Sequence, residues 1–391
     1  MRIGFDISQT GDNKAGCGVV ADSLIRAMER LQTGHEFLLY PAVGDLFWDP
    51  EYRKSTFHPT SERMRRVLAP SDFQASAHFW LYPGPDFEGQ LKRPDIVHIN
   101  NFFAPKGLAH ARLVWTLHDL DYLLHPDWSS EANRIGCFEG AFGAARRADL
   151  VVSISEFSRT QFLQVFPHYP SDRVVTVPLA SRFNAAPRKR PAALPALEPD
   201  SYWLSVATLQ PRKNVARLVR AWSRLRTDNP STPKLVLTGG EGWLMDDILR
   251  ELNNPIHRDG LIVAGYVDDE SLAWLYANCF AFVFATLAEG FGLPVLEAMS
   301  LGAAVVCSNT SSLPEVTGDA ALHTNPWDEY AIQSSMAKLQ AGPGVRATLR
   351  ERGRRRASEF SWERSARQIL ALYDQCIKLP KLETALGGIS A

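Results

Sequence analysis

Short apolar runs alternate with amphipathic stretches along most of this chain. Runs such as residues 279–285, which are rich in Phe and Val, suit strands that are buried on both faces. Between such runs, apolar residues recur at helical spacing, as over residues 19–31 and 215–225. The alternation predicts an α/β protein in which helices cover mainly parallel sheets.

The same pattern predicts the positions of the individual elements. Expected strands cover residues 2–7, 35–40, 95–98, 113–117, 150–154, 173–178, 202–206, 234–238, 261–264, 279–285 and 303–307. Expected helices cover residues 19–31, 131–147, 215–225, 269–278, 295–301 and 360–377, and a further helix begins at Leu313. Residues 41–90 are poorly patterned. Their basic stretch 62–66 is interpreted as a helix whose arginines face solvent or, alternatively, an acceptor or an anionic membrane.

A proline-rich segment with few apolar residues divides the pattern in two. Its prolines are Pro187, Pro191, Pro195 and Pro199. Such a composition is typical of a linker, and 391 residues agree with two domains. We therefore expect an N-terminal domain at residues 1–180, a linker at 181–199, a C-terminal domain at 200–360 and a helical tail at 361–391.

Composition and charge exclude several classes of protein. The chain is 45% hydrophobic and 22% charged, with a formal net charge of −1, which argues against nucleic-acid binding. Its five scattered cysteines are typical of reduced core thiols rather than of a disulfide or metal framework. The first expected strand starts at Arg2, so we expect no signal peptide. No apolar run approaches the roughly 20 residues of a transmembrane helix. We expect a cytoplasmic protein.

The loop after the strand at residues 279–285 is the strongest candidate site. Ligands of parallel sheets bind at the carboxyl ends of the strands, where this loop would lie. Gly290 and Gly292 allow close approach of the backbone to a ligand, and the following helix start offers free N–H groups. Glu289 and Glu297 flank the loop and can bind sugar hydroxyls. For Glu297 alone, interaction with the helix dipole is an equally good interpretation.

Two further segments place polar side chains at expected strand ends. Arg212 and Lys213 lie in the loop after the strand at 202–206, where adjacent cations suit a diphosphate. Taken alone, they could equally be a solvated basic pair. His118 ends the strand at 113–117, where it could contact a ligand or bond a neighbouring backbone group.

A glycine motif near the N-terminus allows a different function. Residues 16–21 fit G-x-G-x-x-A, with Gly16 and Gly18 as the glycines, and a dinucleotide could bind there. The motif begins about eight residues after the strand rather than immediately, and no acidic residue closes the second strand. An NAD(P)-dependent oxidoreductase is one alternative function.

The segment EGFGLPVLEAMSLGAAVV, which begins at Glu289, resembles the E-x7-E element of the retaining family 4 glycosyltransferases, which have the GT-B fold. It departs from the common pattern at Ser300 and Ala304. Residues 95–98, 118–119 and 211–214 also resemble segments of this family, whereas Val19-Val20 and Ala207-Thr208 differ from it. The resemblance implies two Rossmann-like domains that face each other across a cleft, with the C-terminal helix crossing back to the N-terminal domain.

The resemblance also implies a reaction and its residues. A sugar passes from a nucleotide-sugar to an acceptor hydroxyl with retention of the anomeric configuration. Catalytic roles are implied for His118, Glu289, Lys213 and Arg212. Donor-binding roles are implied for Gly16, Gly18, Tyr266, Val267, Gly290, Phe291, Gly292, Leu293 and Glu297. Among these, Glu297 would bind the ribose and the turn at residues 265–267 the base. We assign no acidic cluster to a divalent metal, and we expect no cofactor.

Members with this overall sequence often transfer mannose from GDP-mannose in the biosynthesis of bacterial surface polysaccharides such as lipopolysaccharide. We therefore expect this donor, a saccharide or lipid-linked saccharide acceptor, and peripheral contact with the inner membrane. A catalytically inactive nucleotide-sugar-binding protein is the other alternative.

Overall fold

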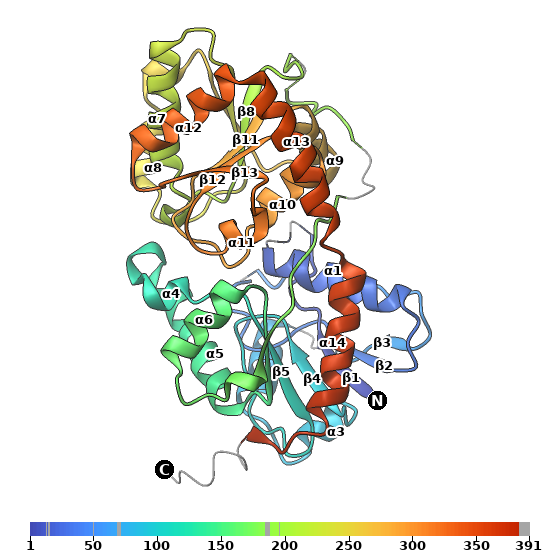
Figure 1. Cartoon of the computed structure of the whole chain (residues 1–391). Coiled ribbons are helices and arrows are strands. Elements are labelled where there is room, and N and C mark those ends of the chain that lie inside the picture. The colour runs from blue at the N-terminus through green and yellow to red at the C-terminus, as the bar shows by residue number, and fades with distance from the viewer. Residues whose placement is uncertain are drawn as a thin grey trace. The chain divides into compact units, whose positions relative to one another are not determined.

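The computed structural model describes residues 1–12, 14, 16–49, 51–68, 72–183, 188–194 and 196–382 (Figure 1). Pro187 and Pro195 of the expected linker, and the last nine residues of the expected tail, lie outside this part of the chain. The chain divides into two compact units. Unit 1 comprises Met1–Pro126, Glu131–Leu179 and Trp362–Ala391, and unit 2 comprises Asp127–Ser130 and Ala180–Ser361.

Unit 1 is built on a parallel sheet that has seven strands within the described residues, in the order β3-β2-β1-β4-β5-β6-β7. The strands are β1 (Arg2–Asp6), β2 (Glu36–Tyr40), β3 (Met64–Arg66), β4 (Ile96–Ile99), β5 (Arg112–Leu117), β6 (Leu150–Ser153) and β7 (Val174–Thr176). The strand order reverses between β1 and β4, and ligands of doubly wound sheets bind beside such a reversal.

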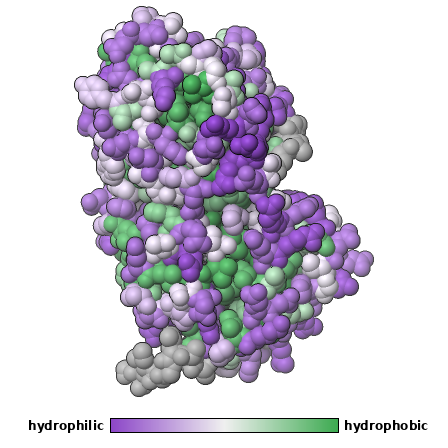
Figure 2. Space-filling model, in the orientation of Figure 1, coloured by the Kyte–Doolittle hydropathy of each residue, from purple (hydrophilic) through white to green (hydrophobic). Residues whose placement is uncertain are grey.

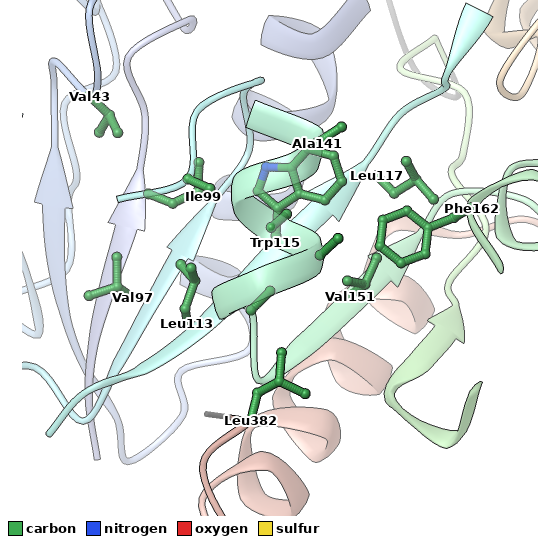
Figure 3. Close-up of a cluster of buried hydrophobic side chains, with 14 of the residues drawn as sticks. Val43, Val97, Ile99, Leu113, Trp115, Leu117, Ala141, Val151, Phe162 and Leu382 are labelled. Atoms are coloured by element: carbon green, nitrogen blue, oxygen red, sulfur yellow. The ribbon is translucent and has the colours of Figure 1, made fainter. Parts of the chain in front are cut away.

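The helices of unit 1 cover both faces of this sheet. They are α1 (Gly16–Arg30), α2 (Phe73–Leu81), α3 (Phe87–Gln90), α4 (Asp121–Leu124), α5 (Glu131–Arg147), α6 (Glu156–Val165) and α14 (Trp362–Cys376). Side chains alternate between the faces of a strand. Trp115 of β5 packs with Ala141 of α5 and Phe162 of α6 on one face (Figure 3). Thr116 points to the other face, where α1 and α14 lie side by side (Figure 1).

Unit 2 has a second parallel sheet, with six strands in its described residues, in the order β10-β9-β8-β11-β12-β13. The strands are β8 (Tyr202–Val206), β9 (Lys234–Thr238), β10 (Leu261–Gly265), β11 (Ala281–Phe284), β12 (Val305–Ser308) and β13 (Ala321–Thr324). The helices are α7 (Val215–Asp228), α8 (Asp246–Leu252), α9 (Asp269–Asn278), α10 (Leu293–Ser300), α11 (Leu313–Thr317), α12 (Glu329–Ala341) and α13 (Pro343–Ser358). Here the strand order reverses between β8 and β11.

The predicted helix at residues 62–66 is wrong, because this stretch contains strand β3. Met64 is buried, and β3 pairs in parallel with β2 at the edge of the sheet. Arg65 forms an ion pair with Glu36 at 2.9 Å. Arg66 donates hydrogen bonds to two backbone carbonyl groups, at 3.1 and 2.7 Å. These arginines therefore complete an edge strand and do not lie on an amphipathic helix.

Arginines are concentrated in the last turns of α13, where Figure 2 shows a hydrophilic surface. Arg352, Arg354 and Arg355 are exposed. Arg356 is half-buried and donates to the carbonyl groups of Val316 and Glu315, at 3.0 and 2.7 Å. The cluster is therefore partly solvated, and it also satisfies the free carbonyl groups at the end of α11.

Candidate active site

Two loops of unit 2 meet at the reversal of its strand order. Strands β8 and β11 are neighbours, so the loops that leave their carboxyl ends are neighbours as well. The Leu287 N–H donates to the carbonyl of Arg212 at 2.8 Å, and Nη1 of Arg212 donates to the carbonyl of Ala288 at 2.9 Å. These bonds join the loop after β8 to the loop after β11.

The predicted cations and the first predicted carboxylate come together at this junction. Nζ of Lys213 lies 2.6 Å from Oε1 of Glu289, and Nη1 of Arg212 lies 3.4 Å from Oε2. All three side chains are largely buried, with 11, 16 and 8% of the side chains of Lys213, Arg212 and Glu289 exposed. Burial by itself would raise the pKa of Glu289, but the two cations outweigh it and hold this pKa below its ordinary value.

Asn214 holds this arrangement in place, although the sequence analysis assigned it no role. It has a left-handed backbone with φ of 58°, a conformation that Asn tolerates better than most residues. Its Nδ2 donates to the carbonyl groups of Ala285 and Pro326, each at 2.8 Å. Asn214 therefore fixes the start of α7 against the end of β11.

The glycine loop leads into a helix start without a side-chain cap. Gly292 has φ of +96°, and a Cβ atom there would lie 2.4 Å from the Leu313 side chain, so no other residue fits without a shift. Helix α10 begins at Leu293, two residues before the predicted start, with Pro294 in its first turn, and no side chain caps it. Such a helix start can bind an anion through its backbone N–H groups.

The side chain of Phe291 is buried, which leaves only its backbone for contact with a ligand. The Phe291 side chain is only 4% exposed and makes an edge-on contact with Phe360 at 5.9 Å between ring centroids.

Glu289 is fixed by two serines. Its N–H donates to Oγ of Ser311 at 3.0 Å, and its carbonyl accepts from Oγ of Ser312 at 2.9 Å.

Glu297, the second predicted carboxylate, lies in a separate buried cluster. Its Oε1 lies 3.1 Å from Nε of Arg182 without the alignment of a hydrogen bond, and its Oε2 accepts from the Tyr276 hydroxyl at 3.2 Å. Burial raises the pKa of Glu297, and Arg182 offsets part of this increase. Arg182 also pairs with Asp269 at 3.4 Å. No sequence pattern points to Arg182, and only the fold brings it to Glu297.

The turn after β10 lies near the same cluster. Gly265 has φ of 65°, and its carbonyl accepts hydrogen bonds from the Gly239 N–H and the Thr238 hydroxyl. Tyr266 is 57% exposed, and its side chain acts electrostatically on Arg182. Val267 is half-buried. The structure thus brings Tyr266 and Glu297, the predicted base and ribose contacts, to the surroundings of one arginine.

His118 and the N-terminal glycines belong to unit 1. Nε2 of His118 lies 2.8 Å from the carbonyl of Asn100, so Nε2 carries the proton and Nδ1 is the acceptor. Burial lowers the pKa of His118, so the ring is neutral at pH 7. The backbone contact that sequence reasoning left open is therefore real, and it fixes the tautomer in which Nδ1 can accept a hydrogen bond.

The glycine segment differs from its prediction, because α1 begins at Gly16 rather than at Val19. A Cβ atom at Gly18 would lie 2.1 Å from the Gln9 carbonyl, whereas one at Gly16 would meet nothing within 4 Å. Gly18 is thus required where the loop after β1 crosses α1.

The described residues contain no group of three or more His, Cys, Asp or Glu side chains that could hold a metal ion. Asp119 and Asp121 have the D-x-D spacing, and the Asp121 N–H donates to Oδ1 of Asp119 at 3.3 Å. Within the described residues, no helix is long and apolar enough to cross a membrane.

Two family models match the chain. The model of glycosyl transferases group 1 matches residues 188–356, and that of Glycosyltransferase Family 4 matches residues 15–180. The O-antigen chain mannosyltransferase B of Escherichia coli is 38% identical over 285 residues, which cover 71% of this chain and 74% of that protein. The serotype-specific mannosyltransferase WbdA of Escherichia coli is 31% identical over 294 residues, which cover 70% of this chain but only 36% of that protein.

Solved structures show the same fold at lower identity. The sucrose-phosphate synthase of Thermosynechococcus elongatus has a TM-score of 0.69 at 20% identity, over 97% of this chain and 99% of that chain. Anabaena Alr3699/HepE, in complex with UDP and glucose, has a TM-score of 0.69 at 19% identity, over 96% of this chain and 100% of that chain. The GT-B fold is therefore confirmed, and the oxidoreductase alternative is set aside. The chain belongs to the family 4, group 1 glycosyltransferases.

Proposed function

We propose that this enzyme transfers mannose from GDP-mannose to a saccharide or lipid-linked saccharide acceptor, with retention, in the assembly of a bacterial surface polysaccharide. The carrying observation is its 38% identity to the O-antigen chain mannosyltransferase B, which extends over most of both chains. We further propose that it acts in the cytoplasm, in peripheral contact with the inner membrane where a lipid-linked acceptor is presented.

The chemical problem is to stabilise a departing nucleoside diphosphate. When the bond between the anomeric carbon and the phosphate oxygen breaks, the diphosphate takes the electron pair and a new bond forms to the acceptor oxygen. Lys213 and Arg212 supply positive charge for the diphosphate, together with the uncapped start of α10. Glu289 is ionised, and in this proposal it holds the cations in place and accepts hydrogen bonds from sugar hydroxyls.

The donor is identified by a panel of GDP-, UDP- and ADP-sugars in thermal denaturation. A ligand that binds only the folded protein stabilises it by RT ln(1 + [L]/Kd), so a concentration of about one hundred times Kd adds about 2.7 kcal/mol. We expect GDP-mannose to raise Tm most, and GDP-glucose less at the same concentration. A larger shift with a UDP- or ADP-sugar would identify a different donor and contradict the GDP-mannose assignment.

Turnover distinguishes an enzyme from an inactive binding protein. With GDP-mannose and a mannose-terminated acceptor, we expect release of GDP in equal amount to product, and an α-configured linkage in the NMR spectrum of that product. A β-linkage would show inversion. Tight donor binding without transfer to any of a set of saccharide acceptors would support the inactive alternative.

Chelation tests the expectation that no metal takes part. We expect EDTA to leave the transfer rate nearly unchanged, because Lys213 and Arg212 already provide the charge that a divalent cation would otherwise supply. The experiment is informative because Asp119 and Asp121 have the D-x-D spacing that can bind a divalent cation. Activity that disappears with EDTA and returns with manganese or magnesium would show that the metal-independent mechanism is wrong.

A further inference from the structure

A chain of hydrogen bonds between buried side chains connects the C-terminal helix to the end of strand β4. The hydroxyl of Tyr373 on α14 lies 2.5 Å from Nδ1 of His98. Nε2 of His98 lies 2.8 Å from Oγ1 of Thr116, and Oγ1 of Thr116 donates to Oδ1 of Asn100 at 3.0 Å. All four residues are at most 2% exposed.

The direction of each bond follows from the groups that are present. The Thr116 hydroxyl gives its only proton to Oδ1 of Asn100, which cannot donate, so Thr116 accepts from Nε2–H of His98. The neutral His98 ring then has an acceptor at Nδ1, because burial lowers its pKa to about 3. The Tyr373 hydroxyl donates to that atom. The chain thus has one orientation, with Tyr373 as its first donor.

The chain ends at the peptide that holds His118. Nδ2 of Asn100 donates to the backbone carbonyl of Asp6 at 3.0 Å, and the Asn100 N–H donates to Oδ2 of Asp6 at 3.1 Å. The carbonyl of Asn100 accepts the Nε2–H of His118 at 2.8 Å. Asn100 is therefore held through its side chain and its N–H while its carbonyl orients the imidazole.

Packing alone does not explain these polar groups. Burying a hydroxyl, an amide and an imidazole is costly unless each is hydrogen-bonded, and the neighbouring positions Val97, Ile99 and Trp115 are apolar. A network in which every member is satisfied fixes one geometry. Nδ1 of His118 makes no hydrogen bond to the described residues, so it is the atom that this geometry leaves as an acceptor.

We propose that Tyr373, His98 and Thr116 are positioning residues that hold the Asn100 peptide, so that its carbonyl keeps His118 in the Nε2–H tautomer with Nδ1 as an acceptor for a sugar hydroxyl. The inference rests on the proposed function, together with the catalytic role that the family resemblance implies for His118. It gives the C-terminal helix a part in positioning His118, since Tyr373 supplies the first hydrogen bond of the chain that holds Asn100.

The tautomers can be measured without any assay of activity. In the wild type with 15N-labelled histidine, NMR should show both His98 and His118 protonated at Nε2. Tyr373→Phe leaves Nδ1 of His98 without its donor, so the chain holds Asn100 less firmly and His118 should become a mixture of tautomers. His98 still donates to Thr116 and should keep its proton on Nε2. Thr116→Val interrupts the chain at its centre and should have the same effect on His118. Thr116→Ser keeps the hydroxyl and should retain the wild-type spectrum.

Steady-state kinetics then show whether the fixed tautomer of His118 contributes to transfer. We expect Tyr373→Phe and Thr116→Val each to lower kcat about tenfold, with KM for the donor changed less than about twofold. Because both changes break one chain, the kcat of the double variant should be only slightly lower than that of the less active single variant. Tyr169→Phe is the matched control. Tyr169 is equally buried in unit 1 and donates to the Ala148 carbonyl at 2.8 Å, outside the chain.

Three results would overturn the inference. The first is a wild-type His118 protonated at Nδ1, and the second is an unchanged His118 spectrum in both variants. The third is an unchanged kcat in a variant whose His118 tautomers have become mixed. Absence of mannosyl transfer by the wild type would instead overturn the proposed function, and the NMR measurements would still test the chain of hydrogen bonds.

Discussion

Lys213→Ala should lower kcat by about a hundredfold or more. The leaving diphosphate gains negative charge as the glycosidic bond breaks, so a nearby cation stabilises the transition state more than the bound donor. One such electrostatic contact contributes about 2–4 kcal/mol to transition-state stabilisation. The measurement is kcat at saturating donor, with KM determined separately, because loss of ground-state binding alone would raise KM and leave kcat intact.

The same substitution affects folding, and the two effects have to be separated. Lys213 is the nearer of the two cations that compensate the buried Glu289 carboxylate, at 2.6 Å against 3.4 Å for Arg212. Its removal should lower the free energy of unfolding, because it leaves a buried charge less well paired. The double variant Lys213→Ala/Glu289→Gln, in which the charge is absent, should recover stability but not kcat.

Lys234→Ala is the matched control. Lys234 is exposed and is the first residue of β9, so it lies at the amino ends of the strands, whereas the candidate site lies at their carboxyl ends. Arg217 is closer in sequence but unsuitable, because its Nη1 donates to Oδ1 of Asn214 at 2.7 Å and its guanidinium lies over the Trp327 ring. Near-normal kcat in Lys213→Ala, measured on folded protein, would show that the phosphate site has been assigned to the wrong residue.

The elements that the sequence predicts well carry strong local signals. Helices α5 and α9 and strands β8 and β9 have the predicted bounds. Serine is favoured at helix starts, and the hydroxyl of Ser155 accepts from the Ser158 N–H at 3.0 Å as the N-cap of α6.

The elements that were missed have weak local patterns. Strand β3 spans only Met64–Arg66, and β13 has half-buried and exposed residues at its centre. Helix α13 is polar on most of its surface, with few buried residues along its length. Such segments are stabilised by contacts with a neighbouring strand or helix, and the local sequence pattern does not show these contacts.

The candidate site shows the same distinction. Lys213 and Glu289 were predicted because strand-end loops of one parallel sheet meet at one edge, and the structure joins them across 76 positions. Arg182 was missed, since a lone arginine in a linker has no pattern that points to Glu297. Asn100 was missed as well, because its role depends on three neighbouring strands. The left-handed Asn214 did carry a signal, as Asn often adopts this conformation.

Arg182→Met should lower the free energy of unfolding at pH 7 by about 3–5 kcal/mol, the range for breaking a buried ion pair by removing one partner. Glu297 would keep its contact with the Tyr276 hydroxyl at 3.2 Å but lose its cation. Adding Glu297→Gln should restore most of the stability, because a neutral amide can accept that hydroxyl and needs no counter-ion. Arg250→Met is the control, since Arg250 pairs with the exposed Asp247 at 2.7 Å and such pairs contribute at most about 1 kcal/mol.

The pH dependence gives this prediction its sign. Burial already raises the pKa of Glu297 above that of the unfolded chain, so the folded state binds the proton more tightly and stability falls as pH rises between the two values. Loss of Arg182 raises the folded pKa further and makes this fall larger. Denaturant unfolding should therefore show the full difference between wild type and Arg182→Met at pH 7 and a smaller one at pH 4, where Glu297 is increasingly protonated. A difference that is equal at both values, or that Glu297→Gln does not reduce, would mean that Arg182 stabilises unit 2 by packing rather than by neutralising Glu297.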